Sequence, residues 1–256
     1  MLRPLQLSPV INYEDVGVRH EYHPWQLNAL CPYCGVSLGS TNKTVDHIPS
    51  KTLLNRPFPA NLAAIPCCLD CNRGFSSDEE YFAVLLECVK HQTFDKRKLT
   101  RDSVLKTVTH TPAILETIKN SVVYDSPTHF TIASDDRRVK AVLLKLVKAH
   151  LCFENSHYLI NDNELLLSFS TLDSMSETDC SHFAEPFKSC LLPEVGSRAL
   201  NNVMIIQDEN ARMIGCCSPW IDYQKETYSF CVAPTGDKVK ILLHEFLCIS
   251  AELIES

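Results

Sequence analysis

The chain has 256 residues, 45% of them hydrophobic, and a formal net charge of −7 with a sequence pI near 5.8. A chain of this length can bury a substantial core, in one large domain or in two smaller ones. Its acidic balance argues against a protein that coats nucleic acid through its overall charge, so any such contact must be local. Because no apolar run approaches the roughly 20 residues that cross a bilayer, we expect a soluble protein.

The first quarter of the chain favours extended and turn-rich structure. Residues 1–28 predict an extended arm with the aromatic anchors Tyr22 and Trp25. Residues 44–48 are typical of a strand. Several prolines then exclude regular helix, which predicts a loop over residues 51–65.

Four helices are predicted behind this loop. The first covers residues 76–91 and begins where serines and acidic residues form a capping signal. The clearest covers residues 136–153, because its apolar residues recur on one face. We interpret Asp135 and Asp136 in front of it as an N-terminal cap rather than as paired catalytic carboxylates. The two shorter helices between them cover residues 99–108 and 112–119.

After residue 160 the pattern changes to short runs that favour β-structure. The predicted strands cover residues 164–169, 202–207, 228–233 and 238–243. The Thr-Gly-Asp sequence at residues 235–237 suits a hairpin loop, and the tail over residues 242–254 fits a strand or a short helix. We therefore expect a small antiparallel sheet that packs on helices.

Two Cys-x-x-Cys pairs are the strongest motif in the chain: Cys31 with Cys34, and Cys68 with Cys71. Each pair places two sulfurs about 4 Å apart on a tight turn, close to the edge of a tetrahedron around zinc. Two pairs leave no open position for chemistry, so we expect a structural Zn²⁺ site. Cys67 lacks the spacing, and we interpret it as a bystander.

The remaining cysteines lie in mixed or apolar runs, where a free thiol packs as a small hydrophobic side chain. The total of thirteen is odd, and the start of the chain lacks a secretory signal, so we expect reduced thiols in a cytoplasmic protein. The eight predicted packing residues are Cys88, Cys152, Cys180, Cys190, Cys216, Cys217, Cys231 and Cys248.

Asp46, His47, Asn61 and Asn72 lie between or beside the two cysteine pairs. The order Cys-x-x-Cys, Asp-His-x-Pro, Asn-Leu, Pro-x-Cys-x-x-Cys-Asn closely resembles the HNH endonucleases. The catalytic unit of that family is a β-hairpin and a helix around one divalent cation, the ββα-metal fold. The matching stretch covers residues 31–86 and implies an N-terminal nuclease unit with a structural zinc.

The resemblance implies a role for each of these residues. His47 is expected to be the general base that takes a proton from the attacking water, and Asn61 to orient its imidazole. Asp46 and Asn72 match the positions that bind the catalytic cation, Mg²⁺ or Mn²⁺. Asn72 stands where the family name has its final histidine, a variant that the family tolerates. Hydrolysis of a phosphodiester independently requires an activated water and charge neutralisation at the phosphate.

Two clusters of basic residues are candidates for local contact with nucleic acid, although solvated helix faces explain them equally well. Lys51, Arg56 and Arg73 also flank the motif and could meet phosphates. The first cluster contains Lys90, Lys96, Arg97, Lys98, Arg101 and Lys106, and the second contains Arg137, Arg138, Lys140, Lys145 and Lys148.

Together these patterns predict an α+β fold with three parts. They are an N-terminal arm over residues 1–28, an HNH nuclease domain with following helices over residues 29–125, and an α+β domain of unknown role over residues 126–256. A weaker resemblance, carried by residues 139–154 and a strand-rich tail with Trp220 and Tyr223, is to stand-alone bacterial HNH proteins and suggests a phage-defence context.

The leading hypothesis is a metal-dependent endonuclease that hydrolyses phosphodiester bonds of nucleic acid, DNA rather than RNA. One alternative is a zinc-stabilised module that binds nucleic acid or protein without catalysis. Another is a nuclease subunit of a larger complex, with a protein partner or a second copy of the chain bound through the C-terminal part.

Overall fold

The computed structural model describes residues 5–12, 30–156, 158 and 161–254. Within these ranges the chain forms six α-helices and four β-sheets, so the predicted α+β class is confirmed. The helices are α1 (Leu69–His91), α2 (Asp102–His110), α3 (Ala113–Lys119), α4 (Arg137–Asn155), α5 (Glu177–Ala184) and α6 (Ala199–Asn202).

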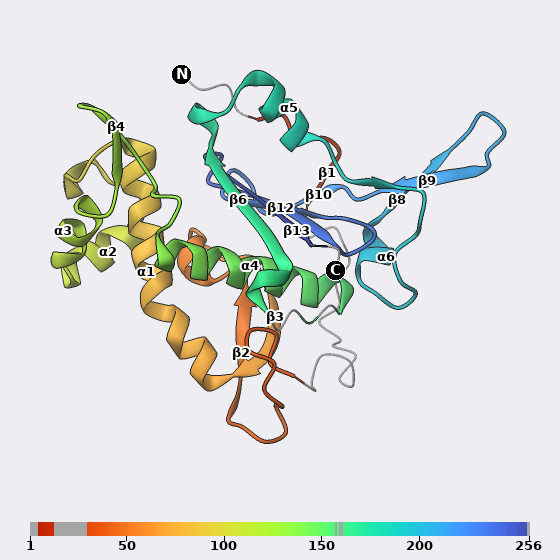
Figure 1. Ribbon diagram of the computed structural model, residues 1–256, viewed down its shortest axis with the longest axis horizontal. Helices are drawn as coiled ribbons and strands as arrows, with labels where there is room; N and C mark the ends of the chain where they lie inside the picture. The colour runs from red at the N-terminus through yellow and green to blue at the C-terminus, as the bar shows by residue number, and fades with distance from the viewer. Residues whose placement is uncertain (1–4, 13–29, 157, 159–160, 255–256) are drawn as a thin grey trace.

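The largest sheet has six strands in the order β1-β10-β11-β12-β13-β6 (Figure 1). Its strands are β1 (Val10–Asn12), β6 (Leu165–Thr171), β10 (Trp220–Gln224), β11 (Tyr228–Val232), β12 (Lys238–Leu243) and β13 (Leu247–Leu253). β1 runs parallel to β10, whereas the other neighbours are antiparallel. The expectation of a small, purely antiparallel sheet is therefore wrong. The extra strand comes from the predicted arm, and its pairing with a distant strand leaves no local signal in the sequence.

Three smaller sheets accompany it. They are the hairpin of β2 (Lys43–Ile48) and β3 (Ala63–Cys68), the hairpin of β4 (Val123–Ser126) and β5 (His129–Thr131), and a sheet of β7 (Lys188–Ser189), β9 (Met213–Cys217) and β8 (Met204–Gln207). Neither β9 nor β10 is among the strands that the sequence predicts. Gly215 and Pro219 act as turn signals in that stretch, but Gly215 lies inside β9 and Pro219 between the two strands.

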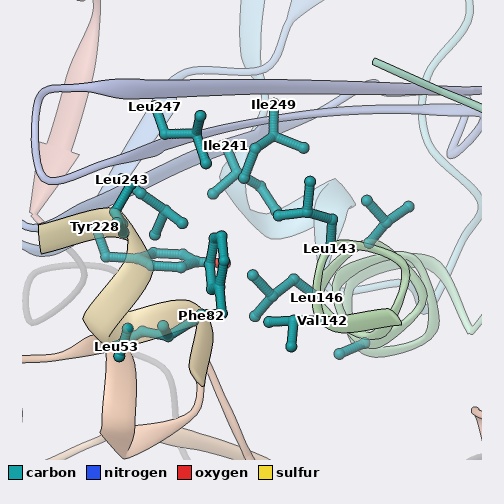
Figure 2. Close-up of a cluster of buried hydrophobic side chains, with 14 of the residues drawn as sticks. Leu53, Phe82, Val142, Leu143, Leu146, Tyr228, Ile241, Leu243, Leu247 and Ile249 are labelled. Atoms are coloured by element: carbon teal, nitrogen blue, oxygen red, sulfur yellow. The ribbon is translucent and has the colours of Figure 1, made fainter. Parts of the chain in front are cut away.

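The main core lies between α1, α4 and one face of the large sheet (Figure 2). Phe82 of α1, Leu146 of α4 and Tyr228 of β11 meet there, and each side chain is at most 2% exposed. Residues from both sides of the expected boundary at residue 125 belong to this one cluster. The two folded parts therefore share a core, and their division into domains stays a prediction.

Helix α1 begins at Leu69, well before the predicted start at residue 76, so that prediction is wrong. Cys68 is the N-cap, because its sulfur accepts a hydrogen bond from the backbone N–H of Cys71 at 3.4 Å. The second cysteine pair thus provides the start of the helix, and the serines and acidic residues of the expected cap lie inside it. The predicted end at residue 91 is confirmed.

Strand β3 occupies the end of the segment that the prolines predicted as a loop, and it includes Pro66. A proline cannot donate a ladder hydrogen bond, but it is tolerated on a strand with a free edge. Among the residues that the structure describes, β3 pairs only with β2, where Pro66 lies opposite Val45, so β3 meets this condition.

The later helices and strands are found near their predicted positions. The cap of α4 is confirmed, because the carboxylate of Asp136 accepts the backbone N–H groups of Arg138 and Val139. The loop at residues 235–237 joins β11 to β12, and the tail is a strand, β13. α2 starts at Asp102, three residues later than predicted. Among the described residues, no helix combines the length and apolar character needed to cross a lipid bilayer.

Candidate functional site

The candidate site is built on the β2–β3 hairpin and on α1, which follows β3 without a break (Figure 1). The hairpin is antiparallel, with His47 opposite Ala64 and Asp46 opposite Ile65. Side chains on β2 alternate between its two faces. Asp46 is buried, whereas Val45 is half-exposed and His47 is partly exposed. The neighbours Asp46 and His47 therefore face different environments.

Four cysteine side chains come together where the hairpin meets α1. The sulfur atoms of Cys31, Cys34, Cys68 and Cys71 all lie within 4.8 Å of one another, and those of Cys34 and Cys68 are 3.8 Å apart. Zn–S bonds of about 2.3 Å in a tetrahedron place sulfurs about 3.8 Å apart. The four thiols could therefore hold a metal ion such as zinc, as the spacing of the motif predicts.

Local backbone structure explains why the first pair is preorganised. The N–H of Gly35 donates to the carbonyl of Cys31 at 2.9 Å, and the N–H of Cys31 donates to the carbonyl of Val36 at 2.8 Å. Gly35 has φ of 73°, a left-handed conformation that favours glycine. This turn holds Cys31 and Cys34 beside the start of α1.

The other cysteines behave mostly as predicted. Cys67 lies outside the cluster, and burial raises the pKa of its thiol to about 12. All thirteen cysteines are free thiols. Cys180 is only partly buried and Cys190 is exposed, so the prediction of eight packing residues is wrong for Cys190, which follows the two-residue edge strand β7. The buried members of the eight are Cys88, Cys152, Cys216, Cys217, Cys231 and Cys248.

Asp46 is the centre of a buried polar network. Its Oδ2 accepts a hydrogen bond from the Tyr33 hydroxyl at 2.6 Å and lies 2.8 Å from Nζ of Lys145. Lys145, on α4, also contacts the carboxylate of Glu79 on α1, which accepts a hydrogen bond from Ser50 at 2.8 Å. Burial disfavours the ammonium, but the two carboxylates outweigh it and hold the pKa of Lys145 above its usual value. The network joins β2, α1 and α4.

Most of this network is not predicted from the sequence. Lys145 belongs to the second basic cluster, and Glu79 belongs to the capping signal of the predicted helix. Both patterns predict charged side chains that are exposed to solvent. The structure buries Lys145, Lys148 and Arg101. No local signal marks the burial of Lys145, because successive residues of a helix lie about 100° apart and Lys145 is therefore turned away from the stripe that contains Leu143 and Leu146.

His47 is partly exposed on the outer side of the hairpin. Burial and, next, the charge of Lys51 lower the pKa of His47 below its usual value. A neutral imidazole can accept a proton, as the predicted general base must. Asn61 lies two residues before β3, whose first residue pairs with Ile48, so it belongs to the same end of the hairpin. Within the described ranges, no hydrogen bond joins Asn61 to His47, and its orienting role stays a prediction.

Asn72 lies in the first turn of α1, against β2. Its amide nitrogen donates to the carbonyl of Val45 at 3.3 Å and to Oγ1 of Thr44 at 3.5 Å. Oxygen atoms of Asp46 and Asn72 are suitable ligands for Mg²⁺ or Mn²⁺. In this conformation, however, Lys145 and Tyr33 already occupy Oδ2 of Asp46. The four-thiol cluster suits a metal ion such as zinc, whereas the carboxylate of Asp46 in the predicted catalytic site is already engaged by Lys145 and Tyr33.

A groove of about 580 Å³ opens beside Lys51, between the loop after β2 and the start of α2. One wall is fixed by the buried Arg101, whose guanidinium donates to the carbonyl of Thr52 at 2.9 Å and to Asn55 at 3.2 Å. The lining also includes the acidic residues Glu80 and Asp102. The basic residues that line the groove are Lys51, Arg56, Arg101 and Lys106.

Comparisons of the chain with protein-family models, with curated proteins and with solved structures found no match. The resemblance to HNH endonucleases therefore rests on the motif and on local geometry alone.

Proposed function

We propose that this chain is a metal-dependent endonuclease of the HNH type that hydrolyses phosphodiester bonds of nucleic acid, with DNA as substrate. One observation carries the proposal. An antiparallel hairpin with His47 on its accessible side runs directly into a helix that carries Asn72, and four clustered thiols hold the junction. A hairpin and a helix in this order are what the ββα-metal resemblance requires.

In this proposal each residue of the motif has one task. His47 accepts a proton from the attacking water, and Asn61 orients its imidazole ring. Asp46 and Asn72 would hold Mg²⁺ or Mn²⁺, which when bound supplies positive charge at the phosphate and at the leaving oxygen. Zinc bound by the four thiols would take no part in catalysis, because the cysteines would fill all four of its coordination positions.

The groove beside the hairpin supports a polyanionic substrate. Lys51, Arg56 and Lys106 line it with exposed basic side chains. The guanidinium of Arg56 also lies 4.8 Å from the centre of the Phe58 ring. Basic side chains that flank an active site position phosphates without reading sequence. A local basic groove on an acidic chain agrees with the composition, which argues against binding of nucleic acid through the overall charge.

The test is plasmid cleavage by the zinc-loaded protein in Mg²⁺ or Mn²⁺, beside the His47→Ala variant. General base catalysis contributes typically about 10²–10⁴-fold, so we expect the variant to lose at least about 100-fold in rate. The melting temperature of the variant should stay near that of the wild type, because His47 is partly exposed and outside the core. EDTA should abolish wild-type cleavage. Cleavage that persists in His47→Ala would contradict the proposal.

A second function is favoured by the ion pair at Asp46. If Lys145 holds this carboxylate permanently, the chain is a zinc-stabilised module that binds nucleic acid or protein without cleaving it. The same assay separates the two, because a pure binding module shifts DNA in a gel and leaves plasmid intact with every divalent cation tested.

A further inference from the structure

Lys145 occupies the position that a metal ion would take between two carboxylates. Its ammonium lies 2.8 Å from Oδ2 of Asp46 and in contact with the carboxylate of Glu79. The hydroxyls of Tyr33 and Ser50 donate to the same two carboxylates. Two carboxylates around one cation are the kind of oxygen ligands that Mg²⁺ and Mn²⁺ prefer.

The ammonium and a divalent cation exclude each other at Asp46. Lys145 is 3% exposed and Asp46 is 6% exposed, so little water screens the charges. Like charges a few ångströms apart repel strongly in such surroundings. A cation that binds Asp46 must therefore displace Lys145.

We propose that Lys145 is an internal cation that closes the candidate metal site, and that a divalent cation binds Asp46 only when this side chain withdraws. The inference rests on the proposed role of Asp46 and adds the regulation of that site. Lys145 belongs to α4, which contacts β2 on one side and strands β11 and β12 of the large sheet on the other (Figure 1). The C-terminal part of the chain thereby controls access of metal to the N-terminal hairpin.

The test measures Mn²⁺ binding to zinc-loaded protein by electron paramagnetic resonance of the free ion. Lys145→Gln removes the internal charge and keeps a hydrogen-bond donor, whereas Lys140→Gln changes an exposed lysine on the same helix. We expect Lys145→Gln to bind Mn²⁺ at least about tenfold more tightly than the wild type, because the repulsion is gone. The Lys140→Gln variant should bind as the wild type does. Adding Asp46→Asn to Lys145→Gln should reverse the gain.

Equal affinity of wild type and Lys145→Gln would overturn the inference, and so would the absence of binding in both. If Lys145→Gln does not fold, Tyr33→Phe provides the second test, since it loosens Asp46 without removing a charge. We then expect a smaller gain in Mn²⁺ affinity, and no gain would overturn the inference. The readout is independent of cleavage, so a nuclease assay that fails while Lys145→Gln gains affinity refutes the proposed function alone.

Discussion

The hairpin–helix unit, formed by residues 30–91, and the large sheet are stabilised in different ways. Strands β11 and β12 bury every side chain except that of Lys238, and α4 packs on these strands with its apolar stripe. The hairpin instead depends at its junction with α1 on four thiols, and along β2 on the Asp46–Lys145 pair. Apolar burial stabilises under all ordinary conditions, whereas thiols need a metal and charges need their partners. The stability of the hairpin–helix unit, which carries the candidate site, thus depends on a bound metal and on charged partners.

The largest expected effect concerns the metal. Cys34→Ser should release zinc and unfold the hairpin, because metal binding contributes on the order of 10 kcal/mol in small zinc sites. Cys190→Ser, at an exposed thiol outside the cluster, should retain zinc and melt as the wild type does. Zinc content and amide hydrogen exchange provide the measurements. Exchange should accelerate in β2 and β3, while β11 to β13 stay protected.

If Cys34→Ser loses amide protection in β11 to β13 as well as in β2 and β3, the two regions unfold as one unit. The hairpin and the large sheet would then not be stabilised independently. Retention of one zinc per chain by Cys34→Ser, with unchanged melting, would show that this thiol has no part in the site.

The features that the sequence predicts correctly are those encoded by residues close together in the chain. Cysteine spacing encodes the geometry of a tight turn, so the four thiols are predictable. The apolar periodicity of α4 and the position of the loop at residues 235–237 are local in the same sense. β3 is missed because Pro66 is a breaker in isolation and becomes tolerable only on a free edge. The ion pair of Asp46 with Lys145 is missed because its partners are far apart in the chain and only the packing of α4 brings them together.

A second prediction concerns the sheet side, at low pH. His150 on α4 is fully buried against β11, and burial lowers its pKa to about 3 from an ordinary 6.5. Below pH 6.5 the unfolded chain therefore binds a proton that the folded chain does not. The free energy of unfolding should fall by about 1.4 kcal/mol per pH unit between pH 6.5 and 4 from this residue.

His150→Phe removes this titration. The variant loses the hydrogen bond between Nε2 of His150 and the Tyr228 hydroxyl at 2.8 Å, so its stability at pH 7 should be lower by about 1–3 kcal/mol. Its stability should, however, decline less steeply towards pH 4. Urea unfolding at several pH values measures the slope. Equal slopes for wild type and variant would mean that His150 is already protonated in the fold or accessible to water.

The smallest expected effect concerns the groove beside the hairpin. In a His47→Ala background, in which we expect cleavage to be slow, Arg56→Ala combined with Lys106→Ala should weaken DNA binding. Each lost phosphate contact reduces the slope of log affinity against log salt by about 0.9. Lys119→Ala is the matched control, because this residue is exposed on α3 and lies outside the groove lining.

If all variants share one slope, DNA does not bind along the groove, and the proposal that the groove holds the substrate is wrong. If only the groove variants change, the DNA-binding surface extends from the hairpin–helix unit onto α2, and the large sheet supports the hairpin through α4.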